Sequence, residues 1–121
     1  MTLKTLAVIS GLYDLGLALT MLFFAREAAL LFGAPPPVPL LNAQLNGVFT
    51  LALGLGYFWA REDVNARRGY FWIFGVIAKG LGALLFVIDH FVQGSPRPFL
   101  LFAFTDGALA LATLALLLRR S

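Results

Sequence analysis

The stretch Gly69 to Phe91, GYFWIFGVIAKGLGALLFVIDHF, is the part of the chain from which the fold is inferred. Its residues are nearly all apolar, and Lys79 lies at its centre. About 20 residues of this kind cross the hydrocarbon core of a bilayer, so the stretch predicts a membrane-spanning helix. Lys79 would then lie near the middle of the bilayer. An ammonium at that depth costs about 3 kcal/mol by insertion scales and marks a functional site, facing either a partner or a wet cavity.

The composition of the 121-residue chain favours the same class of protein. Hydrophobic residues make up 60% of the chain, charged residues make up 12%, and the mean hydropathy is +0.88. These values are typical of a membrane protein of one domain, covering residues 1–121. The chain has no cysteine, which excludes disulfides and thiolate metal sites. Its basic residues form no stripe with exposed aromatic residues, so we expect no nucleic-acid partner.

Four apolar segments predict four spanning helices, at about residues 4–25, 40–60, 69–91 and 98–118. The first segment is too long for a signal peptide and carries Asp14 in its middle, so we expect it to be retained. The connections are short and are rich in proline or charge, which makes neighbouring helices antiparallel. The expected fold class is therefore all-α, an integral membrane antiparallel four-helix bundle.

The basic residues indicate how the bundle is oriented. Six of them lie at the ends that would share one face, and two lie at the opposite face: Lys4, Arg61, Arg67, Arg68, Arg119 and Arg120 against Arg26 and Arg97. This bias predicts that both termini are cytoplasmic in a multi-pass protein of the bacterial inner membrane. Four aromatic residues beside the charged middle connection are expected to form an interfacial belt: Tyr57, Trp59, Tyr70 and Trp72.

Each predicted helix places one polar residue between the bilayer midplane and the outer leaflet. These residues are Asp14, Asn46, Lys79 and Asp106. Small residues accompany the charged residues on their helical faces, so the charges are expected to point inward. Asn42 shares the face of Asn46. We therefore expect these five residues to form a ligand-binding pocket.

The charged residues have two interpretations. In the first, Lys79 forms a structural ion pair with Asp14 or Asp106. In the second, one of the two aspartates carries a proton, because one ammonium is shared by two carboxylates and low dielectric favours a neutral carboxyl without a cationic partner. His90, on the helical face of Lys79, is a further proton-relay candidate. A single histidine cannot form a His-based metal site within one chain, so we expect neither metal nor cofactor.

Three stretches resemble those of a known family. Leu45–Gly47 and Leu53–Tyr57 in the second predicted helix, with the glycine-rich Lys79–Gly82, resemble the DoxX-like superfamily of small four-helix bacterial membrane proteins. The resemblance implies the fold and transfers no catalytic residue. The chain is also similar to small multidrug resistance transporters in length, in its four spans and in an acidic residue of the first helix. That similarity implies proton exchange at Asp14. Lys79 and Asp106 depart from that family's pattern.

The function expected from these residues is a binding or accessory role. A small or lipophilic anionic ligand would bind Lys79 in a pocket that opens to the outer face, with membrane lipids as the other partners. Two alternatives stay open: a proton-coupled transporter acting as a homodimer, and an intramembrane isomerase or cyclase acting on a lipid. No catalytic motif supports an enzyme directly. Glycine-lined helix faces leave room for the homodimer.

Overall fold

The computed structural model describes residues 1–119, and within them all regular structure is helical. The elements in chain order are α1 (Leu3–Phe23), α2 (Ala25–Leu31), α3 (Leu40–Arg61), α4 (Arg68–Tyr70), the π-helix η1 (Phe71–Ala78), α5 (Lys79–Gln93), the 3-10 helix η2 (Arg97–Phe99) and α6 (Leu100–Arg119). α4, η1 and α5 form one continuous helical segment, as do η2 and α6. The prediction of an all-α chain is confirmed for residues 1–119. Arg120, which was counted in the basic bias, lies outside the described residues.

Local residues explain several helix ends. The Thr2 hydroxyl accepts a hydrogen bond from the Thr5 backbone N–H at 3.2 Å and so caps α1. The backbone leaves the helical region at Phe24, so the predicted helix 4–25 ends at Phe23 and α2 is separate. Gly94 ends α5 with a φ of 74°, a left-handed conformation that glycine adopts without strain. Four prolines in residues 35–39 keep the connection between α2 and α3 non-helical.

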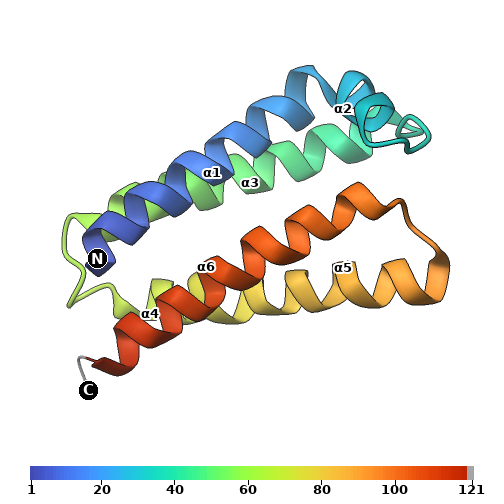
Figure 1. The fold of residues 1–121 in the computed structure, drawn as a ribbon. Coiled ribbons are helices and arrows are strands. Elements are labelled where there is room, and N and C mark those ends of the chain that lie inside the picture. The colour runs from blue at the N-terminus through green and yellow to red at the C-terminus, as the bar shows by residue number, and fades with distance from the viewer. Residues whose placement is uncertain (120–121) are drawn as a thin grey trace.

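The long helices lie in antiparallel pairs. Figure 1 shows α1 running beside α3, and α5 running beside α6. α6 also packs against η1 and contacts α1, so it joins the α1–α3 pair to the α5–α6 pair. The N-terminus, the 62–67 connection and the end of α6 lie at one end of the molecule, while α2 and the turn after α5 lie at the other. We call the first of these the charged end and the second the proline end.

A buried apolar cluster joins the two pairs near the charged end. Its members come from α1, α3, η1 and α6: Leu3, Leu6, Ala7, Tyr57, Ala60, Phe71 and Leu117. At the proline end, aromatic contacts connect the two pairs. The Phe32 ring lies 5.6 Å from the Phe99 ring and 5.2 Å from the Phe102 ring, between centroids. The pairs are therefore held together at both ends, and the polar residues lie between these two contacts.

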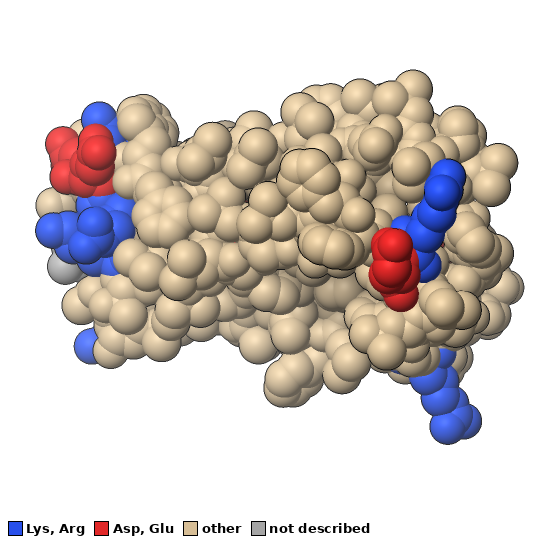
Figure 2. All heavy atoms as spheres, turned by 90° about the horizontal axis from the view of Figure 1, so that it is seen from above, with Lys and Arg blue, Asp and Glu red and all other residues tan. Residues whose placement is uncertain are grey.

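The surface of the molecule is compatible with a multi-pass membrane protein. Among residues 1–119, three helical segments are long and apolar enough to cross a membrane: Leu3–Phe23, Arg68–Gln93 and Arg97–Arg119. Between 11% and 33% of the apolar stretch in each segment is buried, so most of its surface faces outward. Figure 2 shows the charged side chains of one face gathered at the two ends, with an uncharged band between them. Such a band matches the hydrocarbon core of a bilayer.

α3 was predicted as a fourth span but is less apolar than the other three segments. Asn42, Gln44 and Asn46 lie in its first turns and lower its hydropathy. α3 is therefore not among the three segments that are long and apolar enough to cross a membrane. Its packing along α1 covers part of its surface. Whether α3 also crosses the membrane therefore stays a prediction.

α1 and α3 approach each other closely at Gly54. A Cβ atom at this position would lie 3.1 Å from the Leu15 side chain and 3.2 Å from the Gly11 carbonyl oxygen. Gly16, on α1, has no atom within 4 Å of the corresponding position. Glycine at a helix contact lets two backbones pack closely, which is the main source of helix association where the solvent is apolar.

We predict that Gly54→Leu destabilises the fold by about 1–3 kcal/mol, because the new side chain forces α1 away from α3. The midpoint of thermal unfolding in detergent measures this loss. Gly16→Leu is the matched control and should keep or raise the midpoint, since leucine is the better helix former by up to about 1 kcal/mol. Equal midpoints for the two variants would contradict the close α1–α3 contact.

Candidate functional site

The π-helix η1 sets the direction of the segment that leads to Lys79. Its hydrogen bonds close over five residues instead of four, so its turns are wider than those of an α-helix. The buried positions here are Phe71, Gly75 and Lys79, which are four residues apart. In a regular α-helix Trp72, seven residues before Lys79, would share its face. The structure leaves Trp72 only half-buried and buries Phe71 instead. A Cβ atom at Gly75 would lie 2.8 Å from the Thr113 side chain, so η1 also packs closely on α6.

Lys79 forms a buried ion pair with Asp14. Its Nζ donates a hydrogen bond to Asp14 Oδ1 at 2.9 Å, and the two side chains are 9% and 5% exposed. The ring centroids of Tyr13 and Tyr57 lie 5.5 Å and 5.4 Å from the ammonium, within the range of cation–π attraction. The ammonium is therefore held by one carboxylate and two aromatic faces. Of the partners predicted for Lys79, the structure selects Asp14.

Asp106 lies beside this pair without joining it. The carboxyl is half-buried, close to the Tyr13 hydroxyl and within electrostatic range of both Lys79 and Asp14. A Cβ atom at Gly82 would lie 3.7 Å from Asp106 Oδ2, an ordinary van der Waals distance, so the carboxyl lies against α5. Within residues 1–119, Asp106 takes part in no ion pair. One ammonium thus faces two carboxylates but is bonded to one.

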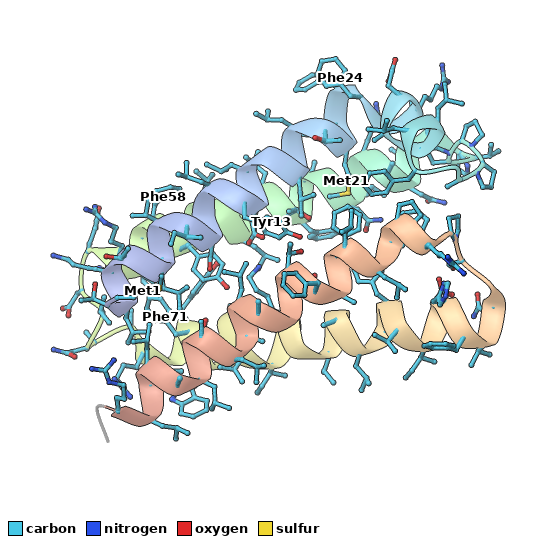
Figure 3. All side chains as sticks on the ribbon, in the orientation of Figure 1. Met1, Tyr13, Met21, Phe24, Phe58 and Phe71 are labelled. Carbon is cyan, nitrogen blue, oxygen red and sulfur yellow. The ribbon has the colours of Figure 1, made fainter. Side chains whose placement is uncertain are left out.

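Tyrosine and threonine hydroxyls connect the charged residues to the neighbouring helices. Tyr13 points from α1 toward the α5–α6 pair, as Figure 3 shows, and its hydroxyl lies 2.7 Å from Thr105 Oγ1. The Tyr57 hydroxyl donates to the Phe74 carbonyl of η1 at 3.2 Å. Tyr57 was expected in an interfacial belt, yet it is 1% exposed. Sequence reasoning missed both tyrosines as site residues, although Tyr57 shares the helical face of Asn46 and Tyr13 precedes Asp14.

Two buried oxygens of α1 have no protein partner. Asp14 Oδ2, the carboxylate oxygen that Lys79 does not bind, and Ser10 Oγ both make no hydrogen bond in the described part of the chain. Both residues are buried. Ser10 lies on the same helical face as Asp14, but the sequence did not single it out as a site residue. The site is therefore polar on the α1 side beyond the ion pair itself.

The other predicted site residues lie away from the ion pair. Asn42 and Asn46 are exposed on α3, and across residues 1–119 their side chains make no hydrogen bond to Lys79 or either aspartate. His90 Nδ1 lies 2.8 Å from the Ser95 carbonyl oxygen, while the Ser95 hydroxyl bonds to Asp89. His90 is eleven residues along the helix from Lys79, about 16 Å in rise. The structure thus brings together Asp14, Lys79 and Asp106, and leaves the other three apart.

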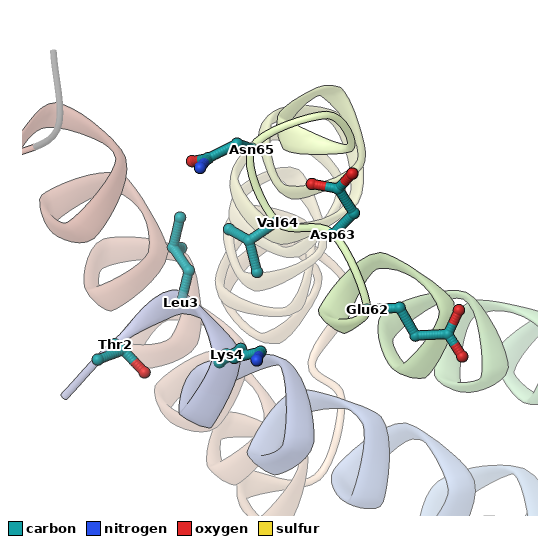
Figure 4. Close-up of a pocket in the computed structure, with 7 residues that line it drawn as sticks. All are labelled: Thr2, Leu3, Lys4, Glu62, Asp63, Val64 and Asn65. Atoms are coloured by element: carbon teal, nitrogen blue, oxygen red, sulfur yellow. The ribbon is translucent and has the colours of Figure 1, made fainter.

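Two cavities lie at the charged end of the molecule. One, of about 330 Å³, is shown in Figure 4 and is lined by Thr2, Leu3, Lys4, Glu62, Asp63, Val64 and Asn65. The other, of about 180 Å³, is lined by Met1, Thr2, Leu3, Leu116 and Arg119. Neither is lined by Lys79 or by either of its neighbouring aspartates. The ligand pocket predicted at these residues, with its mouth at the proline end, stays a prediction.

Comparisons with family models, with curated proteins and with solved structures give no match to this chain. The resemblances to the DoxX-like superfamily and to small multidrug resistance transporters therefore stay predictions. No three His, Cys, Asp or Glu side chains of residues 1–119 come together as a metal site. Functional inference accordingly starts from the geometry around Lys79.

We predict that Asp14→Asn and Lys79→Met each destabilise the fold by about 3–5 kcal/mol, because each leaves a buried charge without its partner. The double variant removes both charges and should lose much less than the sum of the single losses. Thermal unfolding in detergent measures all three variants. Lys4→Met, which removes an exposed ammonium, is the control and should leave the midpoint unchanged. Additive losses in the double variant would argue against a coupled pair.

Proposed function

We propose that the chain is an antiparallel four-helix bundle in the bacterial inner membrane, with both termini cytoplasmic. The three apolar segments, their outward apolar surface and the uncharged band support membrane insertion. The basic bias of the charged end supports its cytoplasmic location. In this proposal α3 is the fourth span, and its packing along α1 compensates for its lower hydropathy.

Within this bundle, we propose that Asp14, Lys79 and Asp106 form a proton-exchange site that serves proton-coupled transport of a small molecule. The observation that carries the proposal is the unequal sharing of one ammonium: Lys79 is bonded to Asp14, and Asp106 lies beside them without an ion pair. An uncompensated charge inside a membrane is costly. Asp106 lowers that cost by holding a proton, and it releases the proton when another cation or a hydrated passage replaces it.

The geometry supports binding of an anionic ligand less well. Such a ligand would have to displace Asp14 from Lys79 and would then face two carboxylates. A displaced, buried Asp14 would itself need a new partner. A proton, by contrast, neutralises the excess negative charge without disturbing the ion pair. Uptake of a proton is therefore the chemistry for which this arrangement is best suited.

The proposal assigns the exchangeable proton to Asp106, and infrared spectroscopy tests this assignment. In lipid vesicles at neutral pH, the protein should show the C=O stretching band of a protonated, buried carboxyl. The band should be missing in Asp106→Asn and retained in Asp63→Asn, which removes an exposed carboxylate of the charged end. An Asp106→Asn spectrum with the band intact would refute the assignment.

The orientation of the bundle is tested with single cysteines, since the chain has none of its own. Gln93→Cys, at the proline end, should react with a membrane-impermeant thiol reagent added outside intact bacterial spheroplasts. Ala66→Cys, at the charged end, should react only after the membrane is opened. Both side chains are exposed, so burial does not confound the comparison. The reverse labelling pattern would place the termini on the outer side.

A further inference from the structure

The two unpartnered oxygens of α1 point to a site that the ion pair does not explain. Ser10 and Asp14 are four residues apart, so they lie one above the other on one face of α1, about 6 Å apart along the axis. Both are buried, and neither Ser10 Oγ nor Asp14 Oδ2 has a hydrogen-bond partner among the described residues. Buried polar groups are almost always hydrogen-bonded, to protein or to an ordered water. Two such orphans on one face call for a shared partner.

A third polar group lies close to Ser10. Ser10 is the polar neighbour of the Tyr57 hydroxyl on α3. That hydroxyl gives its own proton to the Phe74 carbonyl, so its oxygen is free to accept a hydrogen bond. Lys79 approaches Asp14 at Oδ1 and leaves Oδ2 for another donor. The three groups therefore offer a carboxylate acceptor, a phenol acceptor and a serine hydroxyl that can donate.

We propose that Ser10, Asp14 and Tyr57 hold one internal water molecule. The water donates one proton to Asp14 Oδ2 and the other to the Tyr57 oxygen, and it accepts the Ser10 hydroxyl proton. Three hydrogen bonds are the usual number for a buried water. Asp14 Oδ2 and Ser10 Oγ each gain the partner that they lack, and the Tyr57 oxygen accepts the third hydrogen bond. An added cation would be repelled by the Lys79 ammonium, and an anion would be repelled by Asp14. A neutral molecule that both donates and accepts satisfies every group.

The water divides the roles of the two aspartates, a consequence that rests on the proposed proton exchange. With Lys79 on Oδ1 and the water on Oδ2, Asp14 has a partner for each oxygen as a carboxylate. Asp106 lacks an ion-pair partner and remains the group that gains and loses the proton. Ser10 is then a positioning residue: it acts on Asp14 through the water.

Infrared spectroscopy of the full chain in lipid vesicles detects such a water directly. Replacing ordinary water with water enriched in heavy oxygen shifts the O–H stretching band of an internal water. We expect a heavy-oxygen-sensitive band in the wild type that is lost in Ser10→Ala. Thr20→Ala is the matched control on the same helix, because the Thr20 hydroxyl bonds to the Gly16 carbonyl of its own helix. This variant should retain the band.

Thermal unfolding gives the second readout. If a water links the three groups, Ser10→Ala loses a hydrogen bond and the unfolding midpoint falls. If Ser10 is an isolated orphan, the alanine removes an unsatisfied group and the midpoint stays or rises. The proposal is overturned by a spectrum without the sensitive band, or by a band that persists in Ser10→Ala. If Ser10→Ala does not fold, Ser10→Cys keeps the volume with a weaker donor, and the band should then shift.

These outcomes are separate from those that test proton exchange. The carboxyl C=O band reports on Asp106, and the water band reports on Ser10 and Asp14. If the carboxyl band persists in Asp106→Asn while the water band depends on Ser10, the water site stands and only its role in proton exchange is removed. If the water band is missing while the carboxyl band depends on Asp106, proton exchange at Asp106 stands and the water site is refuted.

Discussion

The hydrogen-bonded ion pair between Lys79 and Asp14 is the contact on which the arrangement of this small protein depends. The side chains of Lys79 and Asp14 are only 9% and 5% exposed. Two buried charges are tolerated only if they pair with each other in good geometry. They come from α1 and from the first residue of α5, which are far apart in the chain. The pair therefore ties the α1–α3 pair to the α5–α6 pair between the apolar cluster of one end and the aromatic contacts of the other.

The helices around the ion pair are closely packed. Gly54 lets α3 approach α1, and Gly75 lets η1 approach α6, so the backbones at each of these two contacts lie close together. Tyr13 and Tyr57 then lie against the ammonium, where their rings replace part of its lost hydration. Asp106 lies nearby and forms no ion pair with any residue of 1–119. The same contacts that make the interior compact thus place a second carboxyl beside the ion pair.

Hydropathy predicted the helical class and the position of most helices, because a long apolar run forms few structures other than a helix. The inward direction of Asp14 and Lys79 was also predictable, since small residues accompany them on their helical faces. Asn46 was misleading: its depth matched that of the charged residues, but depth does not say which helices are neighbours, and α3 turns Asn46 to an exposed position. The π-helix was beyond reach of the pattern, because a run of apolar residues does not show whether the backbone hydrogen bonds close over four residues or five. Regular α-helical spacing would place Trp72, and not Phe71, on the face of Lys79.

The wide turns of η1 also bear on how this protein can change in length. A π-helical stretch accommodates a residue more than an α-helix would need to turn through the same angle. A chain shorter by one residue between Phe71 and Ala78 can relax this stretch to an ordinary α-helix and keep Tyr70 and Lys79 in their present relation. Elsewhere in a long helix, the same deletion turns everything beyond it by about 100°. A single-residue deletion is therefore best tolerated immediately before the lysine, where it would first be expected to do harm.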